Sequence, residues 1–205
     1  MNLGIIGAGS LGTALGERLA GAGHSIMFGG GTSARDAAAR QHAEVGSNAD
    51  AAVFGDVVIL SVPFASVGCA LADAGRLDGR VVWSCVNALK PDYTGLAVGF
   101  DDSAAEEVAR RAPAARVVSA IPPFANAVAG GALEYDRELP PTVFVCGDDA
   151  GAKRLVDGLV RDIGAHPVDA GPLQAARLVE PAMMLVVGIA YAGVPRDVGL
   201  RLLER

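Results

Sequence analysis

The chain has 205 residues, of which 51% are hydrophobic and 20% charged, a length that suits one domain or one domain with a small C-terminal extension. This composition excludes a disordered chain, and a net charge of −6 excludes the basic surface with which proteins bind nucleic acid. The three cysteines, Cys69, Cys85 and Cys146, are too scattered for a disulfide framework or a zinc site, and they predict a reducing compartment.

The sequence contains no recognisable targeting segment. Its first residues lack the basic stretch of a secretory signal, so a cytoplasmic protein is expected. The uncharged stretch 181–195 is shorter than the roughly 20 residues that span a bilayer. We interpret it as a buried helix, with a contact in a homodimer as the preferred alternative and no membrane partner.

Short apolar runs alternate with amphipathic segments along the chain. In chain order, the first part is expected to form strand 3–6, helix 10–22, strand 25–28, helix 33–43, helix 49–54, strand 56–62, helix 64–74, strand 80–84, helix 103–112 and strand 115–120. The second part is expected to form strand 142–146, helix 149–163, strand 165–169, a helix from 172 to about 190 that Pro181 should bend, and a last short helix at 194–205.

Strands that are separated by helices indicate βαβ units. The predicted fold class is therefore α/β, a Rossmann-type doubly wound and mostly parallel sheet with a small C-terminal α/β extension. We expect a dinucleotide-binding domain at 1–140 and a small part at 141–205 that closes a cleft. The least regular stretch, 121–141, is long for a loop inside a domain, which predicts a functional or mobile segment.

A glycine-rich motif follows the first predicted strand and opens the first predicted helix. It fits G-x-G-x-x-G and consists of Gly7, Ala8, Gly9, Ser10, Leu11 and Gly12. In such a motif the first glycine permits a tight turn, the second lets the backbone approach a pyrophosphate, and the third lets the helix pack against the strand. The pyrophosphate then meets free N–H groups at the helix N-terminus. The motif predicts a bound dinucleotide.

The end of the second predicted strand favours NADP over NAD. An NAD enzyme places an acidic residue there to bind the ribose 2′-hydroxyl, but this chain has no acid between Phe28 and Asp36. Thr32, Ser33 and Arg35 could donate hydrogen bonds to a 2′-phosphate instead. The alternative is that Ser33 only caps the following helix and Arg35 is solvated.

Acid–base machinery is sparse in the sequence. The histidines His24, His42 and His166 have no carboxylate at a telling spacing, and no Tyr-x-x-x-Lys pair, H-E-x-x-H, Walker loop or G-x-S-x-G motif is present. No metal site and no catalytic side chain are therefore predicted. A hydride acceptor that is itself a cofactor needs mainly orientation from the protein, which fits this shortage.

Three sequence blocks resemble the deazaflavin-dependent NADP reductases, which are NADP:coenzyme F420 oxidoreductases. The blocks span nearly the whole chain and read IIGAGSLGTALGERLAGAGHSI, VVILSVPFASV and VFVCGDDAGAKRLVDGLVRDIGAHPVDAGPLQAARLVEPA. The third is the most specific. The resemblance implies an NADP-dependent oxidoreductase that transfers hydride directly between the nicotinamide and a deazaflavin stacked on it, with NADP and coenzyme F420 as its small-molecule partners.

The same resemblance implies where the cofactors lie. NADP would bind at the glycine loop, and the loop Val62, Pro63 and Phe64 would lie beside the nicotinamide. Asn87 and Ala88, together with the turn 119–122, would lie in the cleft. Family members often carry Ser-Arg directly after the glycine that ends the second strand, whereas this chain has Gly30-Gly31 there.

Two other functions remain open from the residues alone. One is an NADPH-dependent reductase of a small imine, carbonyl or flavin-type acceptor, since the N-terminal block also suits pyrroline-carboxylate-reductase-like enzymes. The other is a non-catalytic dinucleotide sensor, which the shortage of catalytic motifs permits.

Overall fold

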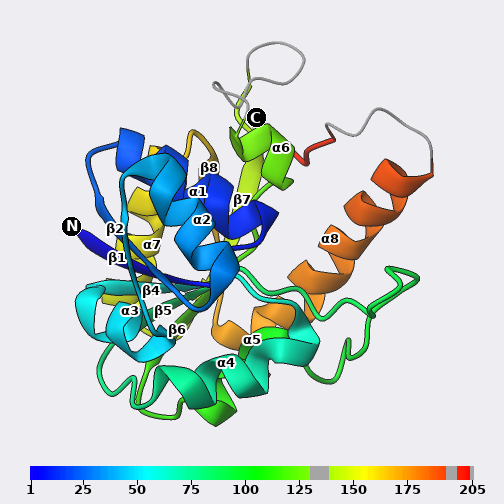
Figure 1. Ribbon diagram of the computed structural model, residues 1–205. Helices are drawn as coiled ribbons and strands as arrows, with labels where there is room; N and C mark the ends of the chain where they lie inside the picture. Colours follow the sequence, from blue (N-terminus) through cyan, green and yellow to red (C-terminus); the bar gives the residue numbers. More distant parts are fainter. Residues whose placement is uncertain (130–138, 193–197, 204–205) are drawn as a thin grey trace.

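An eight-stranded sheet forms the centre of this computed structural model, which describes residues 1–129, 139–192 and 198–203 (Figure 1). The strand order is β3-β2-β1-β4-β5-β6-β7-β8, and β7 runs antiparallel to β6 while the other neighbouring pairs are parallel. The strands are β1 (Asn2–Ile6), β2 (Ser25–Gly29), β3 (Glu44–Gly46), β4 (Val57–Leu60), β5 (Val81–Ser84), β6 (Arg116–Ala120), β7 (Thr142–Gly147) and β8 (His166–Gly171).

Helices cover both faces of the sheet, as Figure 1 shows. One face carries α1 (Ser10–Gly21), α2 (Thr32–Gln41), α6 (Ala125–Ala129) and α7 (Ala150–Asp162). The other carries α3 (Asn48–Phe54), α4 (Val67–Ala74), α5 (Ala104–Arg111) and the start of α8 (Ala176–Tyr191), with the short 3-10 turns η1 (Phe64–Ser66) and η3 (Leu173–Ala175) before α4 and α8. The predicted doubly wound, mostly parallel α/β sheet is confirmed.

The pleat of the strands separates the two cores. Ile5 and Trp83 pack into the core under α1 and α7, whereas their chain neighbours Ile6 and Val82 pack into the core under α3, α4 and α5. Both sets are buried because successive side chains in a strand point to opposite faces. Continuous apolar runs in the sequence therefore mark central strands that are covered on both sides.

Helix α8 carries large apolar side chains on an exposed face as well as on the face that packs against the body of the protein. It runs through Pro181 without a break and extends away from the sheet (Figure 1). Leu178, Leu185 and Ile189 are 69%, 65% and 41% exposed, while Val179 and Val187 are buried. The prediction of a buried helix is thus wrong for one of its faces, because the sheet does not extend beneath the outer turns.

Three local predictions differ from the structure. The strand β3 was missed, because its three residues carry no apolar run and exist as a strand only through pairing with β2. Ser33 is not the N-cap of α2, because Gly31 holds that position and Ser33 lies inside the first turn. The predicted helix 194–205 is wrong where the chain is described: residues 198–203 are not helical, and the Leu200 carbonyl accepts a hydrogen bond from the Thr142 N–H at the start of β7.

The irregular stretch predicted at 121–141 contains the short helix α6, and its residues 130–138 lie outside the described part of the chain. The predicted domain boundary at residue 140 falls immediately before β7, the strand at which the sheet changes direction. Because β7 and β8 continue the same sheet, that boundary stays a prediction.

Candidate functional site

The glycine loop leaves the N-terminus of α1 open. Gly7 has φ of +103°, a conformation that side chains disfavour, and a Cβ there would lie 2.2 Å from the Ser61 carbonyl oxygen. A Cβ on Gly12 would lie 2.0 Å from the Gly7 carbonyl oxygen, whereas none of the described atoms lies within 4 Å of a Cβ on Gly9. Gly9 is the N-cap, and no described side chain caps the helix. The free N–H groups fit an anionic pyrophosphate.

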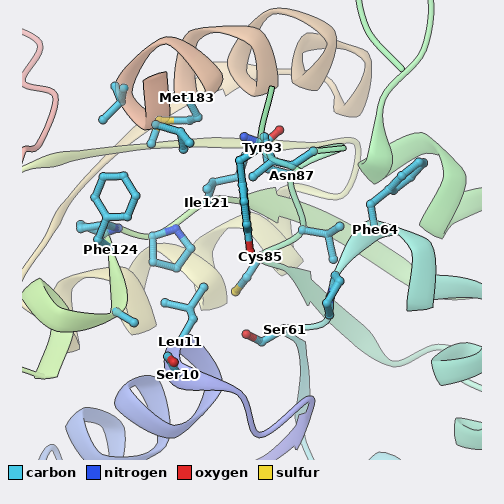
Figure 2. Close-up of a pocket in the computed structure, with 18 of the residues that line it drawn as sticks. Ser10, Leu11, Ser61, Phe64, Cys85, Asn87, Tyr93, Ile121, Phe124 and Met183 are labelled. Carbon is cyan, nitrogen blue, oxygen red and sulfur yellow. The ribbon is translucent and has the colours of Figure 1, made fainter. Parts of the chain in front are cut away.

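A cavity of about 670 Å³ begins at this loop (Figure 2). Its wall is formed at the carboxyl ends of β1, β4, β5 and β6, where ligands bind in open α/β sheets. Helix α8 supplies the opposite wall: Figure 2 shows Ser10 and Leu11 on one side, Met183 on the other, and Cys85, Asn87 and Tyr93 between them. The cavity therefore joins the glycine loop to a chamber beneath α8.

The chamber is chiefly apolar. Its apolar lining includes Val62, Pro63, Phe64, Ile121, Phe124, Met183, Val186 and Val187. Among the described residues that line it there is no carboxylate and no imidazole. Cys85 lines the chamber (Figure 2), and burial raises the pKa of its thiol well above its usual range, so that it stays protonated near neutrality. The ionisable groups among the described lining residues are Cys85, Lys90, Tyr93 and Tyr191, and the rest of the chamber surface is mainly apolar.

Two tyrosines close the chamber on the side of α8. Tyr93, in the loop after β5, stacks on Tyr191 at the end of α8, with ring centroids 5.6 Å apart and an angle of 13° between the ring planes. Both rings line the cavity. The loop and the helix are almost one hundred residues apart in sequence, and nothing local in either segment predicts that they meet.

The predicted site residues fall into four groups. Gly9, Ser10, Leu11, Val62, Pro63, Phe64 and Asn87 line the cavity, together with Ile121 and Pro122 of the predicted turn. Gly7, Ala8 and Gly12 shape the glycine loop just outside it. Ala88 is fully buried and does not line the cavity, because its N–H points to Glu180 Oε2 at 3.3 Å.

The fourth group, Thr32, Ser33 and Arg35, lies outside the cavity at the start of α2. All three residues are exposed, and β2, which precedes them, pairs with β1 beside the glycine loop. Gly31 is the N-cap of α2, and no described side chain forms a capping hydrogen bond at this end of the helix. The first turn of α2 therefore presents N–H groups, two hydroxyls and a guanidinium to solvent next to the dinucleotide loop.

Sequence reasoning missed the residues that α8 contributes, namely Met183, Val186, Val187 and Tyr191. It also missed the roles of Cys85, Tyr93 and Phe124. The position of Cys85, directly after β5, is a usable signal because ligands bind beyond the carboxyl ends of parallel strands. The α8 residues carry no such signal, since their spacing is that of any apolar helix.

This fold and this loop define a Rossmann-type dinucleotide-binding protein. The family model described as "NADP oxidoreductase coenzyme F420-dependent" matches residues 2–88. The F420-dependent NADP reductase of Methanocaldococcus jannaschii is 31% identical over 161 residues, which cover 76% of this chain and 71% of that protein. The reductase of the same name from Methanothermobacter thermautotrophicus is 28% identical, over 98% of this chain and 94% of its own.

A solved structure shares the fold. It is that of a candidate F420-dependent NADP reductase from Arthrobacter sp. FB24, with a TM-score of 0.85, 24% identity, and coverage of 98% of this chain and 99% of the other. The chain belongs to the family of F420-dependent NADP reductases, which are NADP-dependent oxidoreductases. The family resemblance predicted from the three sequence blocks is confirmed.

Proposed function

We propose that this protein transfers a hydride directly between NADP(H) and coenzyme F420, with the deazaflavin stacked on the nicotinamide. The observation that carries the proposal is the continuity of the cavity, which begins at the glycine loop and ends in an apolar chamber under α8. A volume of about 670 Å³ lies in the usual range for small-molecule and cofactor sites. The names of the homologous reductases support the same pair of substrates.

Different residues along the cavity would bind different parts of the two cofactors. The N–H groups at the start of α1 would hold the pyrophosphate, and Val62, Pro63 and Phe64 would lie beside the nicotinamide. The side-chain oxygen of Asn87 is buried and receives no hydrogen bond from the described residues, so that it is available to an amide donor of a ligand. Met183, Val186 and Val187 would cover the deazaflavin and exclude water.

The proposed reaction needs no redox change in the protein. NADPH transfers a hydride, which is one proton with two electrons, to the deazaflavin and is released as NADP⁺. The deazaflavin also takes up one proton from water. The described cavity lining holds neither a carboxylate nor an imidazole that could supply this proton. The role left to the side chains is to align the rings at contact distance, which by itself can remove several kcal/mol from a bimolecular barrier.

The test follows absorbance after NADPH and oxidised coenzyme F420 are mixed with the protein, with NADH and FMN as controls. We expect rapid loss of the deazaflavin band with NADPH and little change with either control. If NADPH binds but the band persists, the hydride acceptor is a different small molecule or the protein is a sensor, and the proposal is wrong.

NADP preference gives a separate prediction at α2. Arg35 lies in the first turn of α2, and no described side chain caps the N-terminus of this helix. A phosphate dianion bound there would be stabilised by the guanidinium and by the helix dipole. We expect Arg35→Ala to weaken NADPH binding about tenfold, the lower end for a charge-assisted hydrogen bond at an exposed site, and to leave NADH binding unchanged. Fluorescence titration measures both.

Arg40→Ala is the matched control, because Arg40 lies in the last turn of the same helix. It removes an equal charge at a distance from the expected phosphate. Equal losses in the two variants would show that only the overall charge matters, and the assignment of Arg35 would fail.

We also propose that two copies of the chain associate through the outer face of α8. The supporting observation is the row of exposed apolar side chains Leu178, Leu185 and Ile189, since large apolar patches on a protein surface mark interaction sites. Light scattering on the purified protein should give the mass of two chains. A mass of one chain at micromolar concentration would refute the homodimer.

The cytoplasm is the proposed place of action, with small-molecule cofactors as partners and neither nucleic acid nor membrane. By length and composition the stretch Leu173–Tyr191 could cross a membrane. In this fold, however, its first half is tied to α5 through the buried Glu180 and the ion pair between Arg177 and Glu106. Recovery of the protein in the membrane fraction after cell lysis would contradict the proposal.

A further inference from the structure

Glu180 is an ionisable residue in a mainly apolar helix, and only 1% of it is exposed. Its carboxylate accepts three backbone hydrogen bonds: Oε2 from the Ala104 N–H at 2.9 Å and from the Ala88 N–H at 3.3 Å, and Oε1 from the Ala105 N–H at 3.2 Å. One side chain therefore joins α8, the first turn of α5 and the loop after β5. Burying a carboxylate is costly unless it is paired in this way.

The same residue also reaches the cavity wall. The backbone carbonyl of Glu180 accepts a hydrogen bond from Asn87 Nδ2 at 3.4 Å, and Asn87 lines the cavity while Ala88 lies directly behind it. With its nitrogen held by α8, the Asn87 side chain keeps its oxygen free of the described donors. The Glu180 side chain thus holds α8 against α5 and the loop after β5, while its backbone carbonyl orients Asn87.

The outer turns of α8 need such an anchor. Pro181 follows Glu180 and has no N–H to donate along the helix. Beyond it, Met183, Val186 and Val187 form the chamber wall, while the helix extends away from the sheet (Figure 1). Among the described side chains of α8, Glu180 is the last one that forms a hydrogen bond to the rest of the protein. A shift at this point would be carried into the whole wall.

A second link between the same two helices provides a comparison. Arg177, one turn earlier on α8, pairs with Glu106 of α5 at 2.8 and 2.9 Å, and this pair is partly exposed. Neither side chain of this pair forms a described hydrogen bond to Asn87 or Ala88, although Glu106 also accepts one from the Ser103 hydroxyl directly before α5. Loss of this pair would loosen the contact between α5 and α8 without touching the cavity.

We propose that Glu180 is a positioning residue that sets the affinity for the second substrate by fixing the α8 wall and Asn87 relative to the glycine loop. This inference rests on the proposed function, because coenzyme F420 is taken as the ligand under α8. The glycine loop itself makes no bond to Glu180, so the affinity for NADPH should depend on this residue far less than the affinity for the deazaflavin.

The experiment compares Glu180→Ala, Glu180→Gln and the control Arg177→Gln. We expect Glu180→Ala to raise the KM for coenzyme F420 at least tenfold, with kcat and the Kd for NADPH changed less than threefold. Glu180→Gln keeps the volume and one acceptor oxygen and should lie between this variant and the wild type. Arg177→Gln should change the KM less than threefold. Should Glu180→Ala not fold, Glu180→Gln decides the question.

A measurement without turnover separates this inference from the proposed function. Amide hydrogen exchange at Ala88, Ala104 and Ala105 should accelerate in Glu180→Gln and not in Arg177→Gln. If the wild type fails to reduce coenzyme F420, the proposed function is wrong, and faster exchange confined to Glu180→Gln still supports the anchoring role. An unchanged KM with unchanged exchange, or equal effects in Arg177→Gln, would overturn the role of Glu180.

Discussion

Replacement of Gly9 by alanine is expected to weaken NADPH binding about a hundredfold and to leave the fold nearly as stable as before. A Cβ at this position meets no described atom within 4 Å, and the backbone, with φ of −75° and ψ of −170°, is open to any residue. Alanine is a poorer N-cap than glycine, which costs at most about 1 kcal/mol. The added methyl group would stand where a pyrophosphate must approach the N–H groups of α1.

Gly12→Ala is the matched control, since it adds the same methyl group three residues away. There the Cβ would lie 2.0 Å from the Gly7 carbonyl oxygen, so that α1 must move away from the loop. This variant should lose stability by about 1–3 kcal/mol, the usual cost of overpacking, as well as affinity. Urea unfolding and NADPH titration measure the two effects. If Gly9→Ala binds NADPH like the wild type, the pyrophosphate does not lie at this loop.

The glycine loop could be predicted from the sequence because its signals are local. The strand, the turn glycines and the helix follow one another within about twenty residues, and the parallel sheet then places the loops after β4 and β5 at the same edge. Val62, Pro63, Phe64 and Asn87 were predicted from the family resemblance, and all four line the cavity. Ala88 was predicted from the same resemblance and does not line the cavity, because it is fully buried in the core under α4 and α5.

The far wall of the site could not be predicted in this way. Its closure depends on contacts between residues that are 75 to 93 positions apart, such as those of Glu180 with Ala105 and Asn87. In the sequence Glu180 stands in an apolar stretch and resembles any polar residue on a helix. Only the fold shows that this side chain is buried, and that α8 is held to the rest of the protein at this residue.

The stability of the protein should depend on pH through Glu180. Burial raises the pKa of this carboxyl to about 7, against the opposing effect of its three backbone hydrogen bonds, and the nearby Glu106 charge adds to the rise. In the unfolded chain the pKa returns to about 4.5. Between these values the folded protein holds a proton that the unfolded chain releases, so the free energy of unfolding falls as the pH rises.

The expected loss of stability follows from the difference between the folded and unfolded pKa values of Glu180. The stabilisation by the protonated form is fully present below pH 4.5 and is lost as the pH rises through 7, which amounts to about 3 kcal/mol. Glu180→Gln cannot lose a proton and should escape this loss. Because pH 5 already lies above the unfolded pKa, urea unfolding from pH 5 to pH 8 should show the stability difference between wild type and Glu180→Gln moving by about 2–3 kcal/mol in favour of the variant.

Glu106→Gln is the control for this measurement. The ion pair with Arg177 lowers the pKa of Glu106, so its contribution to stability is present above about pH 4.5 and is lost only in more acidic solution. The free energy of unfolding of Glu106→Gln should thus run nearly parallel to that of the wild type from pH 5 to pH 8, departing only by the small part of the Glu180 pKa rise that the Glu106 charge causes. If the Glu180→Gln curve is parallel as well, Glu180 is ionised at little cost in the folded protein. If instead the Glu180→Gln variant gains stability relative to the wild type as the pH rises, ionisation of Glu180 lowers the free energy of unfolding even though this side chain holds the wall of the chamber.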